Sequence, residues 1–212
     1  MFETIKVSFS PAPDQHRRYV LTSGDQDSLR RLLSLESLVD WAFLGSLAGS
    51  GSAHVVGTRD TFTIPRARKV HQPLYTAPYT SLVAAIASIK ALTTIPSTRY
   101  ATEADRSAYK YPHVIVTNGP GTGFIIALVA YILKLVAIIP ATHCKVVYIE
   151  SWARTTGLSL TGKLFYGTGI AEVFGVQHQE LAEKYKGAVY VGEVGATEGA
   201  LMGPGEEGEA GN

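Results

Sequence analysis

A glycine-rich segment, residues 118–123, is the strongest candidate in this sequence for binding a ligand. It follows a β-branched run, residues 113–117, and opens a stretch of helical composition. Glycine lets the backbone approach a ligand closely, and a helix N-terminus offers free N–H groups and partial positive charge. The pattern therefore predicts a phosphate or pyrophosphate site, although a tight strand-to-helix turn without a ligand would read the same. The glycine spacing is not that of a dinucleotide-binding loop. The predicted ligands are Asn118, Gly119, Gly121 and Thr122.

A carboxylate follows the next predicted strand. Glu150 comes directly after the apolar run 145–149, which places it at the edge where parallel α/β sheets bind ligands. There it can orient a sugar hydroxyl or act as a general base. The alternative is a structural carboxylate that pairs with Arg154 or caps the following helix.

Two further loops follow predicted strands. Residues 22–25 (Thr-Ser-Gly-Asp) come after the strand 17–21, and their hydroxyls and carboxylate can meet a ligand or simply form a turn. Arg66 and Arg68 come after the strand 60–64 and Pro65. Arginine forks bind pyrophosphate well, so these two are secondary candidates, with a solvated loop as the alternative.

Composition excludes several classes of function. The chain has 212 residues, with 19 Lys and Arg against 18 Asp and Glu, so it lacks the basic excess of a nucleic-acid-binding protein. A single cysteine excludes an internal disulfide framework and a cysteine-rich zinc site. The histidines have no metal-ligand spacing and no nucleophile elbow is present, so we expect no metal, no cofactor and no nucleophilic catalysis.

The elements that position these residues alternate between strand and helix. We predict strands at 17–21, 60–64, 113–117, 145–149, 174–177 and 188–191, and helices at 29–35, 82–92, 124–135, 159–166 and 180–185. This alternation predicts an α/β fold with a doubly wound, mostly parallel sheet. We assign residues 1–16 as an uncertain N-terminal segment, 17–194 as the domain with a flexible Gly/Ser loop at 45–57, and 195–212 as a disordered tail.

Two predicted helical segments are apolar all round. Residues 72–96 contain Lys90 as their only charge, and residues 124–139 contain only Lys134. The most apolar of these segments, residues 124–139, is 16 residues long and contains Lys134. A membrane-spanning helix needs about 20 apolar residues, so we predict no such helix. A helix on a sheet normally has one polar face. These outer faces therefore need cover from a partner protein, a bilayer surface or further packing within the chain.

Five segments in order carry a family resemblance: residues 19–25, 63–72, 117–123, 147–154 and 158–163. Together they resemble the family of asparagine-linked glycosylation protein fourteen, the membrane-anchoring subunit of the dolichol-pathway UDP-N-acetylglucosamine transferase. The resemblance covers roughly residues 17–194. It implies a Rossmann-like N-terminal half of a split GT-B glycosyltransferase.

The resemblance also implies a function. The chain would be the acceptor-binding and scaffolding subunit of a two-chain enzyme, and a separate catalytic subunit would bind UDP-N-acetylglucosamine. The pair would add the second GlcNAc to GlcNAc-diphosphodolichol, a lipid-linked diphosphosugar acceptor, at the cytosolic face of the endoplasmic reticulum membrane, which is continuous with the nuclear envelope. The chain would be inactive alone, with Glu150 at the acceptor sugar and the glycine loop at the pyrophosphate.

The sequence departs from the family at its start. Family members have a membrane helix and a first strand ending in a Gly-Ser-Gly-Gly-His-Thr loop, whereas residues 49–54 imitate that loop at a different position. Residues 4–9 can form a strand, but too few residues separate them from the next strand for a parallel crossover. We therefore predict a sheet that lacks the usual first strand or has an antiparallel substitute.

Two alternatives remain open at this point. One is a non-enzymatic, anchorless scaffold that only binds the catalytic subunit. The other is a self-sufficient enzyme that binds a nucleotide sugar, which needs both halves of a GT-B fold and more residues than this chain has.

Overall fold

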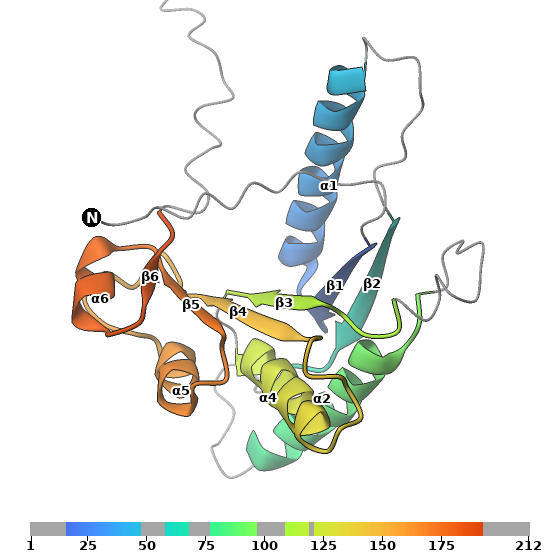
Figure 1. The fold of residues 1–212 in the computed structure, drawn as a ribbon. Coiled ribbons are helices and arrows are strands. Elements are labelled where there is room, and N and C mark those ends of the chain that lie inside the picture. The colour runs from blue at the N-terminus through green and yellow to red at the C-terminus, as the bar shows by residue number, and fades with distance from the viewer. Residues whose placement is uncertain (1–15, 48–57, 68–76, 97–108, 119–120, 193–212) are drawn as a thin grey trace, which may run out of the picture.

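The structure, a computed structural model, describes residues 16–47, 58–67, 77–96, 109–118 and 121–192. Strands and helices alternate throughout, and every strand pairing is parallel (Figure 1). This confirms the predicted α/β class with a Rossmann-like arrangement. In chain order the elements are β1 (His16–Thr22), α1 (Gln26–Leu47), β2 (Thr58–Ile64), α2 (Ala77–Thr93), β3 (Val114–Thr117), α4 (Gly121–Leu135), β4 (Lys145–Ile149), α5 (Leu160–Thr168), β5 (Val173–Val176), α6 (Gln179–Lys184) and β6 (Val189–Tyr190).

The described strands form two sheets. β1 pairs with β2, in a register that runs from His16 opposite Thr58 to Thr22 opposite Ile64. The other four strands pair in the order β3-β4-β5-β6. Within the described residues β1 and β3 each have a partner strand on one side only, so the sheets stay separate. Residues 4–9, the predicted substitute strand, lie outside the described part of the chain.

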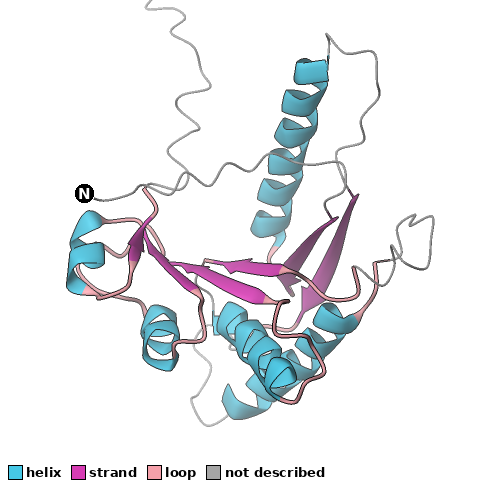
Figure 2. Ribbon diagram, viewed as in Figure 1, coloured by secondary structure: helices cyan, strands magenta, loops and turns pink. Residues whose placement is uncertain are grey.

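Helices cover both sides of the strands. Figure 2 shows α2, α4 and α5 beneath the strands, while α1 rises on the other side. α2 packs along α4, and Leu92 in its last turn joins Val129, Ala130 and Leu133 of α4 in one buried cluster. No helix in the described residues is both long and apolar enough to cross a membrane.

The four-stranded sheet has an aromatic core. Tyr148 of β4 stacks on Phe165 of α5 with ring centroids 4.4 Å apart, and Phe124 of α4 meets Phe165 edge-on at 5.1 Å. Burial raises the pKa of Tyr148 to about 12. Rings in these geometries add attraction beyond the apolar area they bury. This core fixes α4 and α5, whose first residues lie at the carboxyl edge of the sheet.

The two-stranded sheet is held by ion pairs instead. Arg17 and Tyr19 point to the same face of β1 because side chains alternate along a strand, and both donate hydrogen bonds to Glu36 of α1. On the opposite face Arg18 binds Asp60 of β2 and donates to the carbonyls of Ala91 and Thr94 at the end of α2.

Candidate functional site

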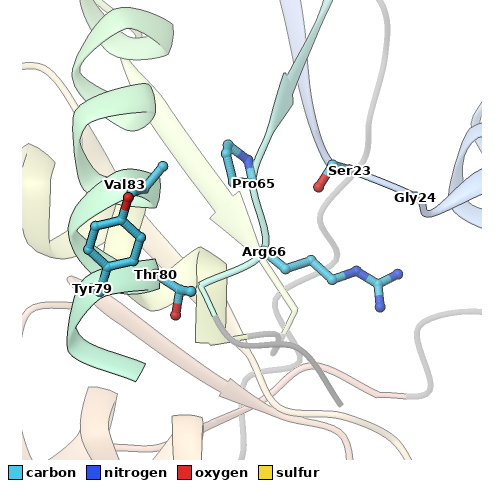
Figure 3. Close-up of a pocket in the computed structure, with 7 residues that line it drawn as sticks. All are labelled: Ser23, Gly24, Pro65, Arg66, Tyr79, Thr80 and Val83. Carbon is cyan, nitrogen blue, oxygen red and sulfur yellow. The ribbon is translucent and has the colours of Figure 1, made fainter. Parts of the chain in front are cut away.

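A hollow of about 520 Å³ opens where β1 and β2 end and α2 begins. Figure 3 shows the loop after β1, the loop after β2 and the first turns of α2 around it, with the Arg66 side chain extended toward the loop after β1. The carboxyl ends of parallel strands meet at one edge of a sheet, which is where such folds bind ligands. The hollow is lined by seven residues: Ser23, Gly24, Pro65, Arg66, Tyr79, Thr80 and Val83.

The peptide of Ala67 fixes the Arg66 loop between two helices. Its N–H donates to Thr122 Oγ1 at 3.2 Å, and its carbonyl accepts from Thr80 Oγ1 at 2.6 Å. Ala67 and Thr122 are both buried. The predicted arginine loop and the predicted glycine loop are therefore brought together, and Arg66 projects from a backbone held on both sides. The Thr122 hydroxyl still has a proton to donate, because it acts here as an acceptor.

The start of α4 approaches the end of β3 very closely. A Cβ added at Gly123 would overlap the Thr117 side chain, whereas a Cβ at Gly121 would meet open space. Asn118 and Gly121 are exposed. This exposure leaves them accessible to a ligand, as the phosphate prediction requires. Gly119, Pro120 and Arg68 lie outside the described residues.

Glu150 is fully buried, and its carboxylate is engaged. Oε1 accepts from the N–H of Ser151 at 2.9 Å, and Oε2 accepts from the N–H and Oγ of Ser159 at 3.0 and 3.1 Å. Ser159 in turn caps α5 by accepting from Gly162 N. These contacts resemble the structural alternative, although Glu150 holds Ser159, the capping residue of α5, and does not cap the helix itself. They favour a positioning role for Glu150, and direct contact with an acceptor sugar stays a prediction.

The loop after β1 contributes more than plain turn chemistry. Ser23 and Gly24 line the hollow, and Gly24 has a φ of 79°, a left-handed conformation that favours glycine. Asp25 turns toward α1, where Oδ1 accepts from Ser28 N at 3.0 Å. The pKa of Asp25 is lowered, first by hydrogen bonds from Ser28 and then by the charges of Arg66 and Arg31. Asp25 therefore caps the start of α1.

Sequence reasoning missed the contribution of α2. Tyr79, Thr80 and Val83 line the hollow, yet the sequence offers only an apolar helical pattern there. One signal was available, because the first turn of a helix that follows a strand lies at the carboxyl edge. In the described part of the chain, no group of three or more His, Cys, Asp or Glu side chains is placed to hold a metal ion.

Comparison with known proteins identifies relatives of the chain. A family described as "Oligosaccharide biosynthesis protein Alg14 like" matches residues 1–194. A protein named UDP-N-acetylglucosamine transferase subunit alg14, from Schizosaccharomyces pombe, is 37% identical over 133 residues, which are 63% of this chain and 55% of that protein. Its namesake from Yarrowia lipolytica is 33% identical over 83% of this chain and 66% of that protein.

The match extends further along another relative. The subunit of the same name from Aspergillus fumigatus is 30% identical over 87% of this chain and 92% of its own length. The chain thus spans between about half and two thirds of the first two relatives and most of the third. No solved structure matches the chain. From the match over residues 1–194, the chain belongs to the family of Alg14-like oligosaccharide biosynthesis proteins.

Proposed function

We propose that this chain is the acceptor-binding and scaffolding subunit of a two-chain UDP-N-acetylglucosamine transferase. Its relatives are named as subunits of such a transferase, so a catalytic subunit that binds UDP-GlcNAc is the partner. The pair adds the second GlcNAc to GlcNAc-diphosphodolichol. A hydroxyl of the acceptor sugar attacks the anomeric carbon of the donor, UDP leaves, and the configuration at that carbon inverts. The complex works at the cytosolic face of the endoplasmic reticulum membrane, to which this subunit recruits its partner.

The hollow at the carboxyl edge is the observation that carries this proposal. Arg66 brings a positively charged guanidinium to it, and the hydrogen bond from Ala67 N–H to Thr122 joins the Arg66 loop to the start of α4. A diphosphate bridging these elements would receive charge-assisted hydrogen bonds from the guanidinium and a hydrogen bond from the N–H of Gly121, the exposed first residue of α4. Asn118 and Thr122 add polar donors at the same edge.

Glu150 acts through the loop it holds. Its carboxylate ties Ser151 to Ser159 and thereby closes residues 151–158 into a loop beside the sheet edge. The exposed Trp152 belongs to this loop. Glu150 therefore positions groups that border the acceptor, and we expect its loss to reduce transfer even where the fold survives.

The test is transfer by the complex reconstituted from this chain and the catalytic subunit. We expect Arg66→Ala to raise the KM for the lipid-linked acceptor about 10- to 100-fold, because two charge-assisted hydrogen bonds are lost, with little change in the KM for UDP-GlcNAc. Arg30→Ala, which removes an exposed arginine of α1, is the matched control and should leave both constants unchanged. If Arg66→Ala leaves the KM for the acceptor unchanged, the proposal that the pyrophosphate binds in this hollow is wrong.

Burial of Glu150 favours a second candidate, the scaffold that only binds the catalytic subunit. Glu150→Gln preserves the shape of the side chain but replaces one of its two acceptor oxygens with an NH2 group, which only donates. If the variant folds, captures the catalytic subunit and transfers at the wild-type rate, Glu150 has no part in transfer. If Arg66→Ala also transfers at the wild-type rate, the scaffold proposal replaces the acceptor-binding one.

A further inference from the structure

α2 presents an apolar stripe on its outer side. Its members are spaced three, four and three residues apart, so at 3.6 residues per turn they fall within about 80° of one another and span about 15 Å of helix. Each is exposed, from 42% for Ile89 to 73% for Tyr79. We call this set the α2 stripe. It consists of Tyr79, Leu82, Ile86 and Ile89.

The buried face of α2 lies nearly opposite the stripe. Ala84, Ser88, Ala91 and Leu92 are buried, and they centre about 150° around the helix from the stripe. That buried face packs on α4 and β2. α2 is therefore apolar on both sides, as its composition predicts, and the described residues satisfy only one of them. A contiguous apolar surface of this kind marks an interaction site.

The charge around the stripe selects the kind of surface it meets. Between Asp60 and Glu103 the sequence contains no Asp or Glu, but it contains Arg66, Arg68, Lys69, Lys90 and Arg99. Lys90 is exposed and follows the last stripe residue on the same helix. An apolar stripe that is flanked by cations and by no acids along the sequence complements a surface that is anionic outside and apolar beneath, which describes a bilayer with anionic lipids.

The ends of the stripe have the chemistry of a membrane interface. Tyr79 stands at one end and Lys90 at the other, with aliphatic residues between them. Tyrosine and lysine combine an apolar body with a polar tip and settle at the level of lipid head groups. Tyr79 also lines the hollow beside Arg66 (Figure 3), so the stripe leads from the surface straight to the proposed pyrophosphate site.

We propose that the α2 stripe lies flat on an anionic bilayer and presents the hollow at its end to lipid-linked acceptor. This rests on the proposed function and names the surface through which it meets the membrane. The lipid tail of the acceptor stays in the bilayer while its diphosphate reaches Arg66, so the chain need not extract the lipid.

The first experiment measures flotation of the full chain with phosphatidylcholine vesicles, with and without phosphatidylserine. We expect binding that requires phosphatidylserine and that falls more than about tenfold in the double variant Leu82→Glu/Ile86→Glu. The matched control is Leu29→Glu/Leu33→Glu, which has the same spacing and places the same charges on exposed leucines of α1. That control should bind as the wild type does. Equal vesicle binding by the wild type and the α2 variant would overturn the proposal.

The second experiment separates the stripe from the proposed activity. The α2 variant, in complex with the catalytic subunit, should lose transfer to acceptor embedded in vesicles and keep transfer to a short-chain, water-soluble diphosphate acceptor. If the α2 variant loses vesicle binding but the wild-type complex transfers to neither acceptor, the membrane role of the stripe is supported and the proposed function is refuted. Loss of catalytic-subunit capture with unchanged vesicle binding would assign the stripe to a protein partner and overturn the bilayer assignment.

Discussion

The two described sheets are stabilised by different kinds of contact, one by ion pairs and the other by aromatic packing. Around the two-stranded sheet, the carboxylate of Glu36 is buried and receives hydrogen bonds from Arg17, Tyr19 and Arg59. Around the four-stranded sheet, Phe165 is buried among Tyr148 and Phe124. Charged contacts depend on pH and on the protonation of each partner, whereas apolar contacts depend on shape and area. The two regions should therefore respond to different perturbations.

The largest expected effect is in the aromatic core. Phe165→Ala should lower the free energy of unfolding by about 3–5 kcal/mol, because a buried ring is replaced by a cavity. Urea denaturation followed by circular dichroism measures the loss, and Leu164→Ala, at an exposed neighbour, should cost less than about 1 kcal/mol. Hydrogen exchange should show lost protection in residues 114–190 before residues 16–64. Simultaneous loss of protection in both ranges would mean that the two sheets unfold as one unit, and the proposed difference between them would be wrong.

The next effect is in the charged network. Glu36→Gln leaves two arginines beside a neutral side chain, so it should cost about 3 kcal/mol. Protection should now be lost first in residues 16–64. Asp27→Asn, on the exposed side of the same helix, is the control and should cost less than about 1 kcal/mol. A cost for Glu36→Gln no greater than that of the control would show that the network contributes little.

Acid should sharpen the same contrast. Burial by itself would raise the pKa of Glu36, but hydrogen bonds from Arg17, Tyr19 and Arg59 outweigh it and lower the pKa to about 2. A lowered pKa gives stability that is present above the unfolded value, 4.5, and is lost as pH falls through about 2. Stability measured by urea denaturation should therefore fall across this window by on the order of 3 kcal/mol.

Glu172 complicates that measurement, and a variant resolves it. Burial raises the pKa of Glu172, but hydrogen bonds from Val146 N and Lys134 lower it overall, so the four-stranded sheet also loses some stability in acid. The difference in pH dependence between the wild type and Glu36→Gln isolates the share of Glu36. Identical pH profiles for the two proteins would contradict the pKa assigned to Glu36.

The smallest effect tests whether the apolar half also relies on a polar contact. A Cβ at Gly162 would overlap the Glu150 carboxylate, so Gly162→Ala should cost about 1–2 kcal/mol. Gly167 lies on the same helix, and a Cβ there would meet open space. Gly167→Ala should therefore be neutral or stabilise by up to about 1 kcal/mol. Thermal denaturation of the pair compares the two glycines directly, and equal shifts would mean that the Glu150 contact is not tight.

The strands were predictable because their signal is local. The predicted strand 145–149 matches β4, and the predicted strand 17–21 lies within β1. Helix starts were predicted less well. α2 begins at Ala77, five residues before the predicted start, and α4 begins at Gly121, inside the predicted loop. Pro78 and Gly121 read as loop residues, yet the first turn of a helix tolerates both because its N–H groups need no partner within the helix.

The contacts that define the site were not predictable from local pattern. Glu36 accepts hydrogen bonds from Arg17 and Arg59, which lie 19 and 23 residues away in the sequence. The spacing of these charges does not predict the pairing. Glu150 was placed at the correct edge because it follows a buried strand, but only the position of Ser159 shows that its oxygens are taken. Arg66 and Thr122 were both predicted to meet a phosphate, and the Ala67 peptide that joins them had no sequence signal.

α2 is fastened at both of its ends. Thr80 in its first turns donates to the Ala67 carbonyl, and the carbonyls of Ala91 and Thr94 at its far end accept from Arg18. α2 therefore cannot tilt without breaking hydrogen bonds to β1 and to the loop that follows β2. A spectroscopic label on α2 would therefore report the inclination of the smaller sheet along with its own, which makes this helix a fixed reference axis for orientation measurements.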